Sequence, residues 1–266
     1  MRRMTGRDES AVLEYLRDHV SECIYLYIDL QKYGTENPDV QFWCTWKGEK
    51  PDTVLMKYYD SFQIFSANEA WDVEETVRLL EEYPVTTICG KKSMIEELSA
   101  RLPEYTAAYG VVVKEEDYRE FPQFASIREA VPEDAVEIAR LMCTDEEFGD
   151  NYEVETLTRQ LADRMREKVG RSYVMWEDGK IVAHTGIFAE NEEIAVESGL
   201  IVDAAYQSKF YGIIIHEYIK KQLLEEGKKL YGFRIKGRMK RCTKAANSDP
   251  VCGFYGKLTR RKESEG

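Results

Sequence analysis

The stretch of sequence that decides the fold is 194-IAVESGLIVDAAYQSKFYGIIIHEYIKKQLLEEGK-228. Residues 194–202 alternate apolar and other side chains, which predicts a strand, and a short polar loop ending at Gly212 follows. The next residues repeat apolar side chains at helical spacing as far as Gly227, a typical helix C-cap. A helix that begins directly after such a loop points unpaired backbone N–H groups and its positive dipole end at the loop. The pattern predicts an anion site, with phosphate as the expected guest.

This stretch resembles the acetyl-coenzyme A site of the GNAT superfamily of N-acetyltransferases. The signature of that superfamily is Gln/Arg-x-x-Gly-x-Gly/Ala between a strand and a long helix, and the loop amides hold the coenzyme pyrophosphate. Gln207 and Gly212 occupy its first and last positions, whereas Phe210 replaces the middle glycine. The resemblance implies that acetyl-CoA is bound by the loop and by the end of the strand, through Leu200, Ile201, Val202, Gln207, Ser208, Lys209, Phe210, Tyr211 and Gly212.

Phe210 is a departure from the signature. A glycine at this position lets the backbone approach the pyrophosphate closely, whereas a bulky residue at positive φ costs on the order of 1 kcal/mol or more. Two alternatives stay open. The loop adopts an ordinary φ and still binds, with Lys209 adding charge, or it has lost tight binding.

The order of predicted elements around this stretch matches the same fold. The segment 126-SIREAVPED-134 predicts a short strand and then a helix with Pro132 in its first turn. It is similar to the GNAT opening IREAxPEDAxxIAxL. A second helix over 154–165 and two strands joined at Asp178-Gly179 follow, and a last strand covers 230–235. The resemblance implies an α/β fold with a mixed, mostly antiparallel sheet flanked by helices.

The predicted domain boundary lies near residue 120, where the charged segment 114-KEEDYRE-120 precedes Pro122. Residues 121–266 then form the GNAT-like domain, and residues 1–120 form a smaller mixed α/β module. In this module the run 54–65 alternates like a strand, and Asn68 is expected to cap a helix over 69–82. The module resembles a degenerate, half-size copy of the GNAT fold. It has no phosphate-loop pattern, so we expect a structural or acceptor-shaping role.

Composition excludes several classes of function. The net charge of −12 argues against bulk nucleic-acid binding, which needs an excess of cations. No run of about 18 apolar residues occurs, so no transmembrane helix is expected, and the N-terminus does not resemble a secretory signal. The six cysteines have neither paired nor metal-ligand spacing. They are expected to be reduced thiols of a cytoplasmic protein, without a disulfide framework or a metal site.

Acetyl transfer from a thioester to an amine needs a base for the amine, a donor for the developing oxyanion and a proton for the leaving thiolate. Glu197 is the candidate base, because a carboxylate in an otherwise apolar strand would be desolvated. The alternative is that strand alternation points it into solvent. Glu190 and His184 are rival candidates for the base. His19 and His216 lie on predicted helices and suggest nothing specific.

The resemblance implies a tyrosine near the C-terminus as the acid, within a pattern like Asn-x-x-Ala-x-x-x-Tyr-x-Lys-x-Gly-Phe. Tyr255 with Lys257 matches the end of this pattern, and Asn247 lies upstream with a spacing one residue too long. In the alternative interpretation, Val251–Leu258 is the final strand and the expected tyrosine is missing.

The leading hypothesis is an acetyl-CoA-dependent N-acetyltransferase that acts on a primary amine of a small molecule or a peptide. A homodimer is left open, and neither nucleic acid nor a membrane is an expected partner. The alternative hypothesis is a degenerate GNAT module that binds an acyl-CoA, or nothing, and has a regulatory or scaffold role. Fold resemblance does not identify the acceptor, because function depends on the site.

Overall fold

The structure, a computed structural model, describes residues 1–145, 149, 152–235 and 250–261. The described chain divides into two compact units. Unit 1 holds Met1–Val113 with residues 233–235 and 251–261, and unit 2 holds Lys114–Gly232 with Pro250. This division differs from the predicted one near residue 120 in two respects. The charged segment 114–120 belongs to unit 2, and the C-terminal strand, predicted within the second domain, belongs to unit 1.

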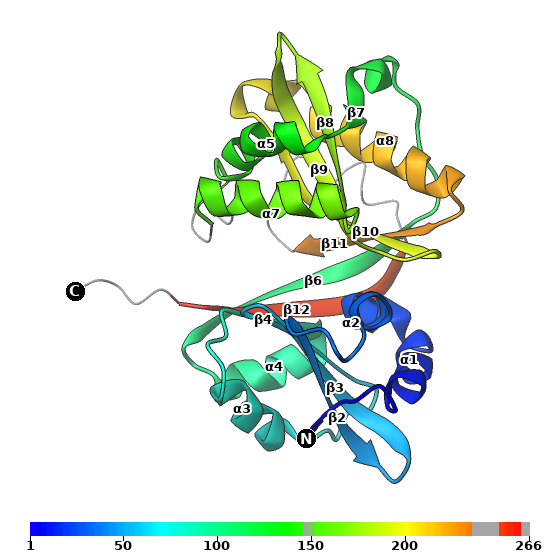
Figure 1. Cartoon of the computed structure of the whole chain (residues 1–266), viewed down its shortest axis with the longest axis vertical. Coiled ribbons are helices and arrows are strands. Elements are labelled where there is room, and N and C mark those ends of the chain that lie inside the picture. The colour runs from blue at the N-terminus through cyan, green and yellow to red at the C-terminus, as the bar shows by residue number, and fades with distance from the viewer. Residues whose placement is uncertain (146–148, 150–151, 236–249, 262–266) are drawn as a thin grey trace, which may run out of the picture. The chain divides into compact units, whose positions relative to one another are not determined.

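Unit 1 alternates helices and strands along the chain (Figure 1). Its elements are β1 (Arg2–Arg3), α1 (Glu9–Arg17), α2 (Val20–Tyr33), β2 (Val40–Lys47), β3 (Lys50–Tyr58), β4 (Ser61–Ser66), α3 (Val73–Glu81), β5 (Thr87–Lys91), α4 (Lys92–Arg101), β6 (Tyr105–Glu115, ending in unit 2) and β12 (Val251–Arg260). The strands lie in the order β1-β2-β3-β4-β5-β12-β6. Only the β4–β5 pair is parallel, and the other pairs are antiparallel.

Two sequence predictions for unit 1 are wrong in detail. The run 54–65 is two strands, because Tyr59 takes a positive φ of 53° and reverses the chain without a glycine. Asn68 does not cap the following helix. Its side chain bonds the Asp52 carboxylate and the Ala70 carbonyl, and the helix begins later, with Asp72 as its cap.

Unit 2 repeats the same kind of order. Its elements are β7 (Ile127–Glu129), α5 (Ala135–Met142), α7 (Val154–Glu167), β8 (Arg171–Glu177), β9 (Lys180–Glu190), β10 (Ile194–Val202), α8 (Tyr211–Glu225) and β11 (Lys229–Ile235), with 3₁₀ turns at Pro122–Ser126, Pro132–Asp134 and Ala204–Lys209. The strands lie in the order β11-β10-β9-β8-β7, and only the β10–β11 pair is parallel. The predicted mixed, mostly antiparallel sheet flanked by helices is confirmed.

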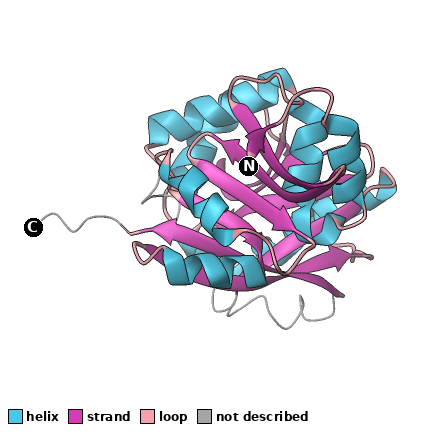
Figure 2. Ribbon diagram, turned by 90° about the horizontal axis from the view of Figure 1, so that it is seen from below, coloured by secondary structure: helices cyan, strands magenta, loops and turns pink. Residues whose placement is uncertain are grey.

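Two apolar layers hold the sheet of unit 2 between its helices α5, α7 and α8, which Figure 1 labels. Figure 2 shows the helices of the chain in cyan beside the magenta strands. On one face, α5 and α7 pack against side chains such as Val174 and Ile181. On the other face, α8 packs through Ile215 and Ile219 against neighbours such as Ile187. Alternation along the strands produces this division, because successive side chains point to opposite faces. The helix predicted between Gly212 and Gly227 therefore forms, and it buries the apolar stripe from which it was predicted.

A polar corner begins unit 2 and orients its first helix. The Arg128 guanidinium donates to both carboxylate oxygens of Asp134, at 2.7 and 2.9 Å, and lies over the Trp176 ring. The Val131 amide donates to the same carboxylate at 2.8 Å. The guanidinium holds the pKa of Asp134 below its usual range, because it stabilises the charged form. The corner ties β7, the start of α5 and β8 together.

The same corner occurs at the start of unit 1. Arg2 donates to both oxygens of Asp8, at 2.9 and 2.7 Å, and its guanidinium lies over the Trp46 ring. The Thr5 amide donates to Asp8 at 2.8 Å. The bond from Arg2 is the main reason that the pKa of Asp8 is lowered to about 2. The two units therefore share an element order and a local side-chain arrangement, which indicates that each is built on one pattern.

Candidate functional site

The parallel strands β10 and β11 separate inside unit 2. β10 pairs with β9 between Ala195 and Val202, but the pairs recorded with β11 among the described residues cover only Ile194–Val196. Glu197 is thus the first residue of β10 beyond that parallel pairing. Among the residues that the structure describes, the remainder of the strand, as far as Val202, has its recorded strand pairs with β9, and it leads into the predicted anion loop.

A bulge shapes the separated part of β10. The register with β9 shifts between Ser198 and Ile201, and Gly199 takes a φ of 70°. The His184 Nδ1 lies 3.0 Å from the Gly199 carbonyl oxygen, and its Nε2 lies 3.2 Å from the Ser172 hydroxyl. Burial lowers the pKa of His184 to about 4, so the ring is neutral at physiological pH. The neutral ring donates from Nδ1 to the carbonyl, so His184 fixes the bulge.

The loop after β10 adopts the conformation that a glycine would favour. The turn over Ala204–Lys209 is capped by Asp203, whose carboxylate accepts from the Ala205 amide at 2.9 Å. Phe210 then takes φ 62° and ψ 20°, in the left-handed region, with 68% of the residue exposed. The alternative in which the loop adopts an ordinary φ is therefore wrong, and the loss of tight binding stays a prediction. An L-residue in this region costs roughly 1–2 kcal/mol.

The first turn of α8 presents backbone N–H groups to this loop. The Ile213 amide donates to the Phe210 carbonyl at 3.0 Å, so the amides of Tyr211 and Gly212 precede the first intrahelical bond. No side chain caps the helix at Phe210, and its first turn contains no acidic residue. A Cβ at Gly212 would lie 3.3 Å from the Val202 Cγ2, which shows how closely the helix start approaches the strand. This helix start can accept an anion.

The helix at the equivalent place in unit 1 has a different start. Asp72 caps α3, and its side chain accepts a hydrogen bond from the Glu75 amide at 2.8 Å. Glu74 and Glu75 add two carboxylates to the first turn. The positive end of this helix is therefore already neutralised by the chain itself, and a phosphate would meet repulsion there.

Charged side chains surround the loop of unit 2. Lys209 lies 2.7 Å from Glu177, and the Tyr211 hydroxyl donates to the other oxygen of that carboxylate at 2.5 Å. The bond from Lys209 is the main cause that lowers the pKa of Glu177. Lys180 pairs with Asp203 at 3.0 Å. These exposed pairs contribute little to stability, so a phosphate that enters the loop can compete for either lysine.

The other residues predicted to contact the coenzyme lie at the end of β10 and in the turn that follows it. Leu200 and Val202 are half-buried on the face of the sheet that α8 covers, and Ile201 packs on the opposite face. Their side chains therefore belong to the core, and their backbone faces the separation of the strands. Gln207 and Ser208 are exposed in the turn. The structure brings the predicted strand end, turn and helix start together as one continuous segment.

Glu197 is buried and faces α8, so the alternative that it points into solvent is wrong. The Thr185 hydroxyl donates to one carboxylate oxygen at 3.0 Å, and the His216 Nδ1 lies 2.6 Å from the other. Sequence analysis assigned no role to His216. A signal was available, because His216 and Lys220 are four residues apart, next to the apolar stripe of the helix.

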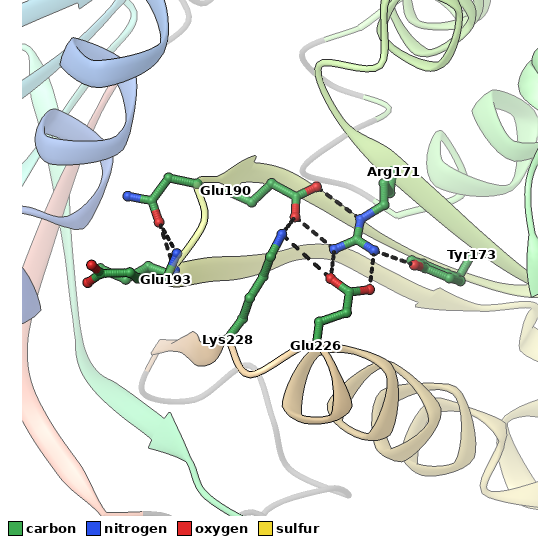
Figure 3. Close-up of polar contacts among 8 residues, drawn as sticks. Arg171, Tyr173, Glu190, Glu193, Glu226 and Lys228 are labelled. Carbon is green, nitrogen blue, oxygen red and sulfur yellow. Dashed lines mark hydrogen bonds and ion pairs between the residues drawn. The ribbon is translucent and has the colours of Figure 1, made fainter.

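Glu190, the rival carboxylate, belongs to a structural network at the far end of α8 (Figure 3). Arg171 donates to both Glu190 oxygens, at 2.9 and 2.7 Å, and to both oxygens of Glu226, at 2.7 and 3.1 Å. Lys228 also donates to Glu190 at 2.5 Å, and Arg171 contacts the Tyr173 hydroxyl at 3.2 Å. The network joins the start of β8, the end of β9 and the C-terminus of α8. It holds the helix in place on the sheet.

Tyr255, the predicted acid, lies in unit 1. It belongs to β12, where it pairs with Lys91 of β5 and Gly110 of β6, and its ring meets the edge of the Phe233 ring. The interpretation of 251–258 as a strand is confirmed, while Asn247 lies outside the described residues. The two predicted catalytic residues, Glu197 and Tyr255, thus belong to different compact units. The assignment of Tyr255 as the acid stays a prediction.

Two further properties concern the described ranges alone. Within them, no cluster of histidine, cysteine and carboxylate side chains has the arrangement of a metal site. None of the helices there combines the length and apolar character that crossing a bilayer requires.

The fold and part of the sequence match known proteins. No curated protein matches the sequence closely enough to count as a relative. Among solved structures, a Drosophila protein covers 99% of each chain at 12% identity, with a TM-score of 0.64. A GNAT-family acetyltransferase from Colwellia psychrerythraea covers 98% of this chain and 99% of its own, at 10% identity and a TM-score of 0.59. A tandem GNAT protein from the clavulanic acid biosynthesis pathway covers 98% of each chain, at 11% identity and a TM-score of 0.57.

At these identities the solved structures show the fold alone. The sequence itself carries the family assignment, because residues 135–257 match the model of the acetyltransferase (GNAT) family. The matched region begins at α5 and contains β10, the loop and α8. Residues 135–257 therefore carry a GNAT-family acetyltransferase domain.

Proposed function

We propose that the protein is an acetyl-CoA-dependent N-acetyltransferase that acts on a primary amine of a small molecule or a peptide. One observation carries this proposal: β10 leaves β11 after Val196 and leads into an uncapped helix start through a residue held at positive φ. This arrangement supplies an anion-binding end for a pyrophosphate, and the part of β10 beyond its recorded pairs with β11 supplies a strand for the rest of the coenzyme. The separated strand has backbone groups that can bond an extended ligand as a neighbouring strand would.

The loop conformation supports the proposal because a positive φ at Phe210 is unfavourable in conformational free energy. A non-glycine residue at positive φ persists only where the surroundings enforce it, and such residues gather at ligand sites. Phe210 therefore preserves the backbone shape of the glycine signature although its side chain differs. The phosphate-binding groups in this proposal are the amides of the turn and of Tyr211 and Gly212, with Lys209 as an added cation.

The difference between the starts of α8 and α3 supports a single coenzyme site per chain. The start of α8 has no capping side chain, whereas Asp72 and the neighbouring glutamates neutralise the start of α3. We infer that unit 1 is a degenerate GNAT copy with a structural or acceptor-shaping role. The tandem GNAT protein that covers nearly the whole chain is consistent with this inference. Four cysteines of the described ranges, Cys23, Cys44, Cys89 and Cys143, are free thiols, which suits a cytoplasmic protein with reduced thiols.

Calorimetry with coenzyme A tests the binding part of the proposal. We expect one coenzyme bound per chain and a melting temperature that rises with coenzyme concentration, because a ligand that binds only the folded state stabilises it. Gly212→Val is the matched variant, because the signature admits only glycine or alanine at this position and a Cβ alone would already lie 3.3 Å from the Val202 Cγ2. Neither heat nor a thermal shift at millimolar coenzyme A would remove the binding proposal.

A second candidate function is a module that binds an acyl-CoA without catalysis. Phe210 in place of the middle glycine of the signature favours this candidate, because its side chain occupies the position where the signature lets the backbone approach the pyrophosphate. Thiol release from acetyl-CoA, measured over a panel of amines from polyamines to peptide N-termini, separates the two functions. Turnover with any amine supports the enzyme. Coenzyme binding without turnover on the whole panel supports the second candidate.

A further inference from the structure

A second buried polar cluster of unit 2, besides His184 and Ser172, lies beneath α8. At its centre, the His216 Nδ1 lies 2.6 Å from a Glu197 oxygen, and the Thr185 hydroxyl donates to the other oxygen at 3.0 Å. On the far side of the ring, the His216 Nε2 lies 3.6 Å from Glu115. Lys220, one helical turn further along α8, lies 3.5 Å from Glu115. The cluster draws on β9, β10, α8 and the end of β6.

The position of this cluster is set by the separation of the strands. The last parallel pair of β10 and β11 joins Val196 to Tyr231, and Glu197 is the next residue of β10. His216 lies in the second turn of α8, six residues after Phe210. At a helical rise of about 1.5 Å per residue, this is about 9 Å along the helix from the loop. The histidine therefore lies between the anion loop and the point where the strands part. In the proposed function, this is the path of the coenzyme arm.

Burial distinguishes the roles that the two residues can have. The Glu197 side chain is 4% exposed, and both of its oxygens already accept hydrogen bonds. The His216 side chain is 13% exposed, so of the pair it is the group nearer to solvent. With Nδ1–H donating to Glu197, the neutral ring carries its proton-accepting lone pair on Nε2. A carboxylate that orients a histidine in this way also stabilises the imidazolium that forms after proton uptake.

We propose that His216 is the proton acceptor of the acyl transfer and that Glu197 is its positioning residue, an inference that rests on the proposed function. The amine nitrogen forms a bond with the thioester carbonyl carbon, and the C–S bond breaks with its electron pair leaving on sulfur as the thiolate. The proton lost by the amine goes to His216 Nε2. This assignment replaces Glu197 as the direct base, the role that sequence analysis gave it.

The surrounding charges fit this assignment. Two carboxylates face the ring, Glu197 at Nδ1 and Glu115 at Nε2, and both favour its protonated form. Lys220 lies 3.3 Å from Glu217 and 3.9 Å from Asp117, and it shares Glu115 with the histidine. The lysine therefore offsets part of the negative charge on the Nε2 side. Glu197 is left as the closest charged partner of the ring.

The pH dependence of kcat/KM for thiol release tests the proposal, because it reports the essential base of the free enzyme. His216→Gln should lower the rate about 10²–10⁴-fold and abolish the acidic limb of the profile, with coenzyme affinity by calorimetry unchanged. Glu197→Gln should lower the rate less and move the acidic limb to lower pH, because the imidazolium loses its carboxylate. His19→Gln, in the turn between α1 and α2 of unit 1, is the matched control and should leave the profile unchanged.

The outcomes separate this inference from the proposed function. If Glu197→Gln abolishes the acidic limb and His216→Gln only moves it, Glu197 is the direct base and the assignment is wrong. A folded His216→Gln protein with the wild-type rate also overturns the assignment, while the acetyltransferase proposal survives. If the wild-type protein binds coenzyme but turns over no amine, both the activity and the assignment fail. Thermal melting of each variant shows whether a lost rate comes from a lost fold.

Discussion

Replacing Phe210 tests whether the loop really holds a left-handed residue at the start of α8. At φ 62°, an L-residue costs roughly 1–2 kcal/mol relative to the right-handed region, and glycine pays no such cost. Glycine gives the unfolded chain more freedom than alanine does, which lowers stability by about 0.4–1 kcal/mol. The balance favours glycine. We expect Phe210→Gly to be about 1 kcal/mol more stable than Phe210→Ala.

The comparison between these two variants isolates the backbone, because both lack the phenyl ring. The ring itself should matter little to stability, since 68% of the residue is exposed. Ser208, exposed in the preceding turn and outside the positive-φ residues, is the matched control position. There the order should reverse, with alanine more stable than glycine by about 0.5–1 kcal/mol.

Equilibrium unfolding in urea measures both differences, and thermal melting gives a second estimate. For a chain of this size, 1 kcal/mol corresponds to a shift of about 2–4 °C. If alanine is as stable as glycine or more so at position 210, as at 208, the left-handed conformation of the loop is refuted. The proposed binding geometry would then lose its main support.

Three further predictions concern stability and modularity. Burial lowers the pKa of His184 from 6.5 to about 4, so between these pH values the unfolded chain binds one more proton than the folded chain. The free energy of unfolding should therefore fall by about 3 kcal/mol as the pH drops through this range. Urea unfolding at several pH values measures this slope, and His184→Gln should flatten it. Arg171→Met leaves two carboxylates without their shared cation and should cost about 2 kcal/mol, whereas Arg166→Met, at an exposed i,i+3 pair, should cost less than 1 kcal/mol by the same measurement. A chain that begins at Gln123 should lose solubility, because β12 loses both of its strand neighbours; a soluble, cooperatively melting fragment would contradict the pairing of β12 in unit 1.

Local patterns predicted the core of unit 2 because they act over a few residues. The Asp178-Gly179 turn, the alternation of β10 and the apolar stripe of α8 all depend on neighbours in sequence, and each element forms where its pattern lies. The turn at Tyr59 has no such signal, since a tyrosine at positive φ cannot be distinguished from a strand residue by its type. The run that contains it was therefore predicted as one strand instead of two.

Partnerships across the chain were not predictable in the same way. Glu197 was singled out because a carboxylate in an apolar strand is unusual, but its partner His216 lies 19 residues later and meets it only because α8 crosses back over the sheet. The place of β12 between β5 and β6 likewise depends on pairing between distant segments. Such contacts are decided by the packed fold, which the order of residue types along the chain does not specify.

The two units share a fold pattern but differ at the place where unit 2 has its proposed coenzyme site. Both have an Arg–Asp corner, and both have one parallel strand pair joined by a helix, β4–β5 through α3 and β10–β11 through α8. In unit 1 the strand before the helix has 6 residues and the helix has 9, whereas in unit 2 these elements have 9 and 15. In unit 2 the two parallel strands diverge after the pair of Val196 and Tyr231, although both continue, and the start of the helix is not capped by a side chain. In unit 1 the Asp72 side chain caps the shorter helix, so the polar groups at this helix start already bond within the chain.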